Sequence, residues 1–219
     1  QGDKKLDFAR GYHIEYWGGM HMPSYGSMHG VQGYNNLAPR TDNNPQESGG
    51  YGAALKQDFR RFYGASVGMD GRGTAIARKE NYCEIDPNKV DKFGIPVLKF
   101  NYKWSNEEVL QAKHMMETFQ EIMHNMGAVI TSNIPGADTL YGLATPGKII
   151  HEGGTTRMGD DPKTSVLNKW GQAHDCNNLY VVDAGPFVQQ GDKNLTWTIL
   201  ALSMRTSEYI LEQKNKLNS

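Results

Sequence analysis

The stretch of sequence best suited to chemistry begins at His151 and reads HEGGTTRMGDDPKTSVLN. A histidine can accept a proton at neutral pH and so can serve as a general base. Gly153 and Gly154 follow it, and glycines disfavour both helix and strand because folding removes their backbone entropy. We therefore expect a loop in which bare backbone lets another chain segment or a flat ligand approach His151 closely.

A second stretch, NNLYVVDAGPFVQQGDKNLTWTILAL, begins at Asn177. Its apolar run ends at Asp183, and Asn194 stands where a long helix is predicted to begin. The N-terminus of a helix offers free N–H groups and a partial positive charge, which stabilise a nearby anion. This pairing of a candidate base with a candidate anion site directs attention to residues 151–202.

Other kinds of catalytic site find no support in the sequence. A zinc protease needs a second histidine four residues after the first, and position 155 is threonine. Cys83 and Cys176 lie in no electropositive motif, so the sequence does not indicate a cysteine nucleophile. Neither G-x-G-x-x-G nor the Walker phosphate loop occurs. The chain is therefore not a complete dinucleotide-binding protein of the usual kind.

The N-terminal stretch GGMHMPSYGSMHG keeps a metal-binding alternative open. His21 and His29 stand there among methionines, and such soft ligands could hold copper. A methionine stripe also follows residues 106–126, but at helical spacing it indicates a core.

Three separated motifs in the C-terminal part together indicate a family. HEGGTTRMGDDPKTSVLN, NLYVVDAG and NLTWTILALSMRTSEYI match, in order and spacing, the C-terminal signature of the glucose-methanol-choline family of flavin oxidoreductases over residues 151–211. NYCEIDPNKVDKFGIPVLKFNY, residues 81–102, resembles the sugar-oxidising branch that includes gluconate dehydrogenase and glucoside 3-dehydrogenase flavoprotein subunits.

The resemblance implies a mechanism and a set of site residues. His151 would take the proton from a hydroxyl of a sugar or polyol, Asn194 would hydrogen-bond the substrate oxygen, and a hydride would pass to N5 of FAD. Residues expected to contact the cofactor are Asp183, Ala184, Asn194, Leu195 and Thr196. The electron acceptor is not specified.

One departure from the family is the missing G-x-G-x-x-G unit that binds the ADP half of FAD. We therefore expect the chain to be the C-terminal part of a longer enzyme, with the N-terminal FAD-binding region as its partner, and to be inactive by itself. A non-catalytic carbohydrate-binding or assembly module remains the alternative, beside the metal-binding protein above.

The charge composition of the chain argues against some classes of binding partner. The chain has 219 residues, 23 basic and 24 acidic, and a net charge of -1, with no run of five like charges. This balance argues against nucleic acid and anionic membranes as main partners. Neither a membrane-spanning stretch nor the apolar region of a signal peptide is visible. We expect a soluble protein of the cytoplasm or periplasm.

The elements that must position the site follow from hydrophobic periodicity. We predict an α+β fold, with an antiparallel sheet backed by helices. Strands are predicted at 11–18, 65–69, 128–133 and 177–185 and on both sides of a turn at 86–94, helices at 106–126 and from about 194, and a short helix within 51–64. The irregular stretch from Gly18 to about Gly52 is interpreted as a lid or partner surface.

The helix at 106–126 has the clearest boundaries. Ser105 and Glu108 form a capping-box pattern, and Gly127 stands at the C-terminal cap position. We assign residues 1–150 to a substrate-binding lobe, and residues 151–219 to the catalytic loop and a strand-helix segment that completes the FAD lobe. Without that lobe, the apolar strand needs another partner, for which a second copy of the chain is one candidate.

Overall fold

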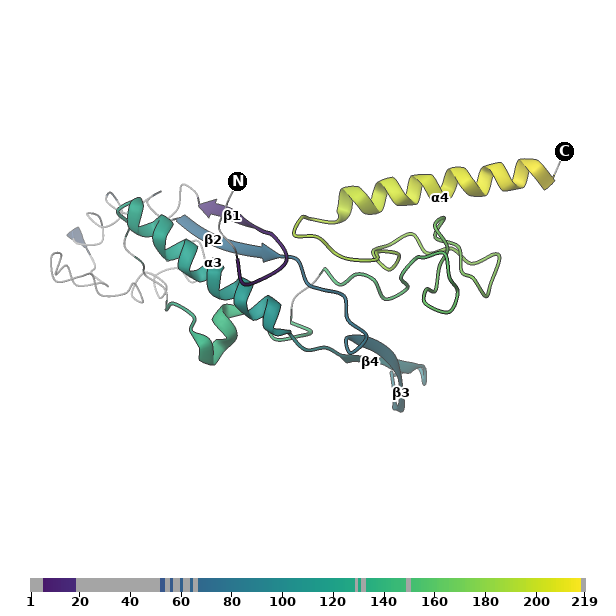
Figure 1. The fold of residues 1–219 in the computed structure, drawn as a ribbon, viewed down its shortest axis with the longest axis horizontal. Coiled ribbons are helices and arrows are strands. Elements are labelled where there is room, and N and C mark those ends of the chain that lie inside the picture. Colours follow the sequence, from purple (N-terminus) through teal and green to yellow (C-terminus); the bar gives the residue numbers. More distant parts are fainter. Residues whose placement is uncertain are drawn as a thin grey trace. The chain divides into compact units, whose positions relative to one another are not determined.

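The computed structural model describes residues 6–18, 52–53, 56, 60, 64, 67–128, 130, 133–148 and 151–217. Figure 1 shows their helices and strands. By its internal contacts the chain divides into two compact units, one made of Gln1–Tyr12, Gly73–Gln111 and Leu143–Ser219, and the other of His13–Arg72 and Ala112–Gly142. The mixture of helices with antiparallel strands agrees with the predicted α+β class.

The first sheet pairs β1 (Tyr12–Gly18) with β2 (Val67–Gly73). Strands are predicted from the sequence in both places, and both predictions are confirmed, although β2 runs on to Gly73. The N–H of Thr74 donates to the carbonyl of Gly11 at 3.4 Å, whereas Gly68 lies against Trp17 at the other end of β1. The two strands are therefore antiparallel.

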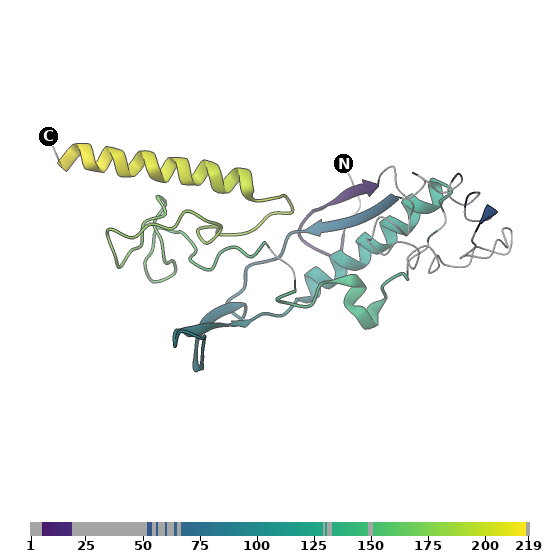
Figure 2. The ribbon, with the colours of Figure 1, turned by 180° about the vertical axis from the view of Figure 1, so that it is seen from behind.

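Helix α3 (Asn106–Asn125) covers one face of this sheet, as Figures 1 and 2 show. A Cβ added to Gly71 of β2 would lie 2.4 Å from the sulfur of Met115 and 3.1 Å from Phe119 of α3. Only a glycine lets the helix come so close to the strand. Met115 and Ala112 are accordingly 7% and 4% exposed and form the core at this point.

The ends of α3 confirm the capping prediction. The N–H of Ser105 donates to a carboxylate oxygen of Glu108 at 2.6 Å. At the other end Gly127 has a φ of +67°, and its N–H donates to the carbonyl of His124 at 2.9 Å. The N–H of Ala128 donates to the carbonyl of Met123 at 2.9 Å, which completes a Schellman motif.

Two buried polar residues of α3 fasten neighbouring loops, which the apolar pattern did not predict. Gln111 is 4% exposed and donates through Nε2 to the carbonyl of Arg10 at 2.9 Å. Glu108 is 5% exposed and accepts the N–H of Ile76 at 2.9 Å. Burial alone would raise the pKa of Glu108, but its hydrogen bonds with Ser105 and the Ile76 N–H outweigh burial and lower it.

Strands β3 (Tyr82–Val90) and β4 (Pro96–Asn101) form a separate antiparallel hairpin. One face of the hairpin is apolar and carries the cross-strand pairs Cys83 with Phe100 and Ile85 with Leu98. The other face carries Glu84 and Lys99, whose charged groups lie 3.2 Å apart. Ile85, Leu98 and Phe100 are 66%, 58% and 60% exposed.

The predicted single sheet is therefore wrong for the described residues, which form two sheets of two strands each. Alternating hydrophobicity indicates which face of a strand is buried, but it does not indicate which strands pair. The range predicted as a strand at 128–133 carries none among its described residues, and the 3-10 helix η1 (Ala137–Gly142) follows it. The irregular stretch from Gly18 to Gly52 and most of the helix predicted within 51–64 lie outside the described residues.

Helix α4 (Thr196–Leu217) confirms the predicted long C-terminal helix. The strand predicted at 177–185 is wrong, since this segment makes one isolated bridge, between Gln172 and Tyr180. Leu179 and Val182 are 52% and 45% exposed. A strand buried on both faces needs neighbouring strands, and the described residues supply none at this point. No helix in the described part of the chain is long and apolar enough to cross a membrane.

Candidate active site

The two stretches singled out for chemistry lie side by side in the structure. Three backbone hydrogen bonds join them: Gly154 N–H to Ala184 O at 3.1 Å, Thr156 N–H to Gly185 O at 3.2 Å, and Met158 N–H to Pro186 O at 3.0 Å. The loop that follows His151 is therefore fastened to the segment that contains Asp183.

The two glycines after His151 make this contact possible. A Cβ on Gly153 would lie 3.3 Å from the carbonyl oxygen of Ala184, and one on Gly154 would lie 3.0 Å from that of Phe187. Gly154 also has a φ of +83°, in the left-handed region that glycine tolerates best. The close approach expected from the sequence is confirmed, and the approaching group is the backbone of residues 184–187.

His151 has an unusual backbone conformation. Its φ is +88°, which few residues other than glycine adopt, and its side chain is exposed. Such strain persists only where the surrounding structure imposes it, and it often occurs at functional sites. Here the hydrogen bonds that begin at Gly154 fix the chain immediately after the histidine.

Asn194 lies in the loop that leads into α4. The carbonyl of Leu195 accepts the N–H of Ile199 at 2.9 Å, so Leu195 occupies the cap position of the helix, and its side chain is 7% exposed. Asn194 and Thr196, on either side, are exposed. No hydrogen bond joins His151 to Asn194 among the described contacts, and their convergence on one point stays a prediction.

The loop before Asn194 nevertheless approaches the loop after His151. A Cβ on Gly153 would lie 3.2 Å from Oε1 of Gln190. The two loops are thus in contact within a few residues of each predicted catalytic side chain.

Asp183 and Thr156 lie at the tightest point between the two segments. The carboxylate of Asp183 accepts the N–H of Gly185 at 2.6 Å, which forms a local turn. A Cβ on Gly185 would lie 2.2 Å from the hydroxyl oxygen of Thr156. This hydroxyl is buried and has no hydrogen-bond partner among the described residues. Thr156 was not predicted as a site residue, although it lies within the GGTTR motif.

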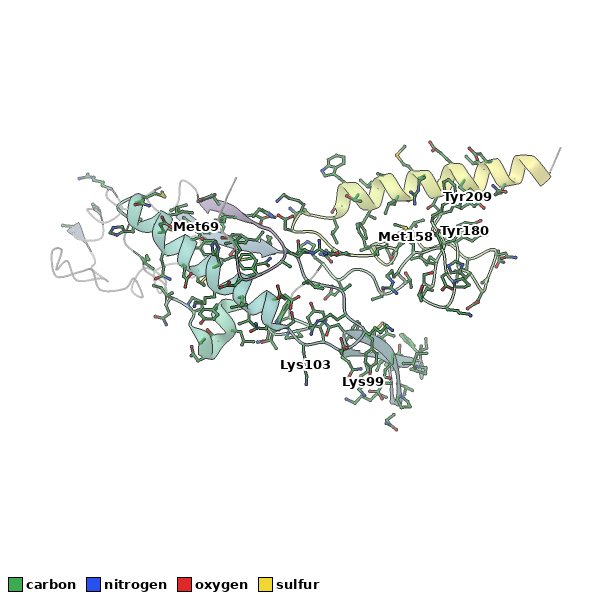
Figure 3. All side chains as sticks on the ribbon, in the orientation of Figure 1. Met69, Lys99, Lys103, Met158, Tyr180 and Tyr209 are labelled. Carbon is green, nitrogen blue, oxygen red and sulfur yellow. The ribbon has the colours of Figure 1, made fainter. Side chains whose placement is uncertain are left out.

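Helix α4 supports these loops from one side. The hydroxyl of Thr206 donates to the carbonyl of Trp170 at 3.0 Å, and Tyr209 stacks on Trp170 with ring centres 4.7 Å apart. Figure 3 shows Tyr209 on α4, and Tyr180 on the segment that the helix covers. Leu167, three residues before Trp170, is fully buried. The irregular segment that contains Trp170 is therefore held in place by helix α4 and not by a sheet.

Metal-binding side chains do not gather in the described part of the chain, where no group of three or more His, Cys, Asp or Glu residues could hold an ion. The soft-ligand alternative rests on His21 and His29, which lie outside the described residues.

Comparison with known proteins indicates the same family as the sequence motifs. Residues 78–203, more than half of the chain, match the family profile described as GMC oxidoreductase. The chain is 28% identical over 170 residues to a gluconate 2-dehydrogenase flavoprotein from Pantoea cypripedii, covering 77% of this chain and 28% of that protein.

Two further relatives have similar coverage. A 2-methyl-1,2-propanediol dehydrogenase from Mycolicibacterium austroafricanum is 31% identical over 160 residues, which is 73% of this chain and 28% of that enzyme. The large subunit of a fructose dehydrogenase from Gluconobacter japonicus is 28% identical over 181 residues, which is 82% of this chain and 32% of that subunit. The chain thus spans roughly a quarter to a third of the length of these relatives.

Proposed function

Since this chain belongs to the GMC oxidoreductase family, we propose that it is the C-terminal portion of an FAD-dependent enzyme that oxidises a hydroxyl group of a sugar or polyol to a carbonyl. The observation that carries the proposal is the set of hydrogen bonds between residues 154–158 and 184–186. These bonds bring the loop of the proposed base beside the segment proposed to contact the cofactor.

His151 is the proposed base, and Asn194 its partner. The imidazole removes the proton from the substrate hydroxyl, and the amide of Asn194 hydrogen-bonds the same oxygen while negative charge develops on it. FAD, when bound, supplies the acceptor for the hydride that leaves the substrate carbon. The contact between Gly153 and Gln190 supports the pairing, because it joins the loops that carry the two side chains.

The residues at this point fit the polar parts of a flavin nucleotide. Thr156 has a buried hydroxyl that lacks a partner among the described residues, so a ligand oxygen could satisfy it. The first turn of α4 begins at Thr196 and contains no acidic residue, so its N–H groups and partial positive charge remain suited to an anionic group. Asp183, Ala184, Asn194 and Leu195 complete the proposed cofactor contacts.

The rest of the enzyme is the proposed partner of the chain's exposed apolar surfaces. One face of α4 carries four exposed apolar side chains, Trp197, Leu200, Met204 and Leu211, at 83%, 51%, 67% and 60% exposure. The apolar face of the β3–β4 hairpin is similarly exposed, and a two-stranded hairpin alone is marginally stable. Patches of this kind mark interfaces. An N-terminal FAD-binding region would cover them, and a second copy of the chain is the alternative cover.

The proposal assigns residues 1–150 to a substrate-binding lobe and residues 151–219 to the lobe that holds FAD. It implies that the chain by itself is inactive, because it lacks the glycine-rich unit for the ADP half of FAD. The particular sugar or polyol and the electron acceptor are not part of the proposal.

Anaerobic reduction of the flavin tests the proposal directly. The gene is expressed with its upstream coding sequence, the protein is purified with its flavin, and the visible absorbance of the oxidised flavin is followed after adding D-fructose, D-glucose, D-gluconate or 2-methyl-1,2-propanediol. Bleaching by at least one of them is expected. A protein that binds sugar but never reduces a flavin would instead be a carbohydrate-binding or assembly module.

A further inference from the structure

Arg10 lies on a short N-terminal segment that the first two turns of α3 hold in place. The N–H of Ala9 donates to Oε2 of Glu107 at 3.0 Å. Nε2 of Gln111 donates to the carbonyl of Arg10 at 2.9 Å and to that of Gly11 at 3.2 Å. Gln111 is 4% exposed, so a side chain that is itself fixed by packing makes these bonds. The backbone that carries Arg10 is therefore firmly supported.

The side chain of Arg10 contacts the loop that carries the proposed partner of the base. Its Nη2 donates to Oε1 of Gln189 at 3.3 Å. Gln189 belongs to the loop of residues 187–194, which ends at Asn194. The N-terminal segment, the start of α3 and this loop all belong to the same compact unit of the chain. Arg10 thus connects the start of α3 to the loop of Asn194.

The loop of residues 187–194 is held firmly at its two ends. The carbonyl of Pro186, just before the loop, accepts a backbone N–H at 3.0 Å, and Leu195, just after it, is 7% exposed. Between these points the chain forms neither helix nor strand, and a Cβ on Gly191 would meet nothing within 4 Å. Backbone in such open surroundings opens at little cost in free energy. A side-chain hydrogen bond in the middle of the loop therefore restricts the position of Asn194.

The residue next to Gln189 contacts the loop of the proposed base. A Cβ on Gly153 would lie 3.2 Å from Oε1 of Gln190. The two glutamines thus join the loop of residues 187–194 to Arg10 on one side and to the backbone that follows His151 on the other. Displacing these glutamines would change the separation of the two proposed catalytic side chains.

We propose that Arg10 is a positioning residue, which fixes the place of Asn194 in the active site by holding Gln189. The inference rests on the proposed function, because it takes Asn194 as the group that hydrogen-bonds the substrate oxygen. It goes further by making the N-terminal segment part of the support of the active site. Arg10 acts through Gln189 and is not itself a catalytic residue.

The test measures anaerobic flavin reduction by the full-length enzyme with whichever of D-fructose, D-glucose, D-gluconate and 2-methyl-1,2-propanediol bleaches the wild-type flavin fastest. Arg10→Ala should lower the limiting rate about 3- to 10-fold, because Asn194 is misplaced but still present. The half-saturating substrate concentration should stay within about twofold, since the affected bond strengthens only in the transition state. Lys113→Ala is the matched control, because it also removes one exposed positive charge, whose partner Glu117 lies on the same helix. It should reduce the flavin at the wild-type rate.

Double variants separate positioning from a general loss of structure. If Arg10 acts through Asn194, the variant that combines Arg10→Ala with Asn194→Ala should be no slower than Asn194→Ala alone. Gln189→Ala removes the same hydrogen bond from the other side, so it should lower the rate as Arg10→Ala does, and it decides the inference if Arg10→Ala folds poorly. Unchanged rates in both single variants, or rate losses that multiply in the double variant, overturn the inference while the proposed function stands.

If none of the compounds reduces the flavin, the proposed function fails on its own. Limited trypsin digestion of the full-length protein then decides whether Arg10 holds the loop, because Lys193 is exposed within it and cleavage there reports how often the loop opens. The fragment that ends at Lys193, identified by mass spectrometry, should form several-fold faster in Arg10→Ala than in the wild type or Lys113→Ala. Equal rates of cleavage, or none in any of the three proteins, overturn the inference.

Discussion

Replacing Gly154 with alanine tests whether the loop after His151 is held against residues 184–187. Two costs follow from the structure. Alanine at a φ of +83° is in the left-handed region, which costs about 1–2 kcal/mol. Its Cβ would also lie 3.0 Å from the carbonyl oxygen of Phe187, and such overpacking costs about 1–3 kcal/mol. The free energy of unfolding should therefore fall by roughly 2–5 kcal/mol.

Gly147→Ala is the matched control for this variant. Gly147 has a φ of +84°, but a Cβ there would meet nothing within 4 Å, so only the backbone cost of about 1–2 kcal/mol applies. Urea unfolding monitored by tryptophan fluorescence gives the free energy of unfolding of both variants, provided that the dependence of this free energy on urea concentration (the m-value) is the same in both. Equal losses in the two variants would refute the reasoning, because they would show that nothing holds the loop of Gly154 against Phe187.

The remaining predictions concern the helix cap, the acid response and the proposed partner of the base. Ser105→Ala should lower the free energy of unfolding by about 1 kcal/mol, measured by urea unfolding, because it removes the hydroxyl that donates to the Glu108 carboxylate at the start of α3. Since the folded state lowers the pKa of Glu108, its carboxylate stabilises the protein above the ordinary glutamate pKa of about 4.3, and this stabilisation is lost as the pH falls further. Glu108→Gln should therefore be less stable than the wild type at pH 7, and its stability should change less between pH 5 and pH 3; a difference that does not depend on pH contradicts this. Asn194→Ala in the full-length enzyme should retain its flavin but slow its reduction about 10- to 100-fold, since a hydrogen bond to developing charge is lost; stopped-flow absorbance measures the rate, and an unchanged rate would remove Asn194 from the site.

The features that could be predicted from the sequence are those fixed by local chemistry. Helix α3 was predicted because Ser105, Glu108 and Gly127 specify its ends within a few residues of chain. Strands β1, β3 and β4 were predicted because alternation is visible within each of them, although β3 runs to Val90, into the range predicted as a turn. Strand β2 was predicted only in its first part, since VGMDGRG shows no such alternation. The close approach near Gly153 was predicted because two successive glycines favour little else.

The features that could not be predicted depend on contacts between distant residues. Alternation within a strand does not specify which strands share a sheet, so the predicted single sheet was wrong for the described residues. Residues 177–185 have the composition of a buried strand but have no neighbouring strand among the described residues, and Val182 is 45% exposed. Buried polar residues were missed for a similar reason. Gln111 bonds to Arg10, and Thr156 lies against Gly185, and neither contact leaves a periodic signal.

The most direct test of the account is the rate at which substrate reduces the flavin in the His151→Ala variant of the full-length enzyme. At saturating substrate we expect the rate to fall by about 10²- to 10⁴-fold with the flavin still bound, because the base that removes the hydroxyl proton is gone. Glu152→Ala, which changes the exposed neighbouring residue, should reduce the flavin at the wild-type rate. A His151→Ala rate within a few-fold of the wild type would contradict the assignment of His151 as the base.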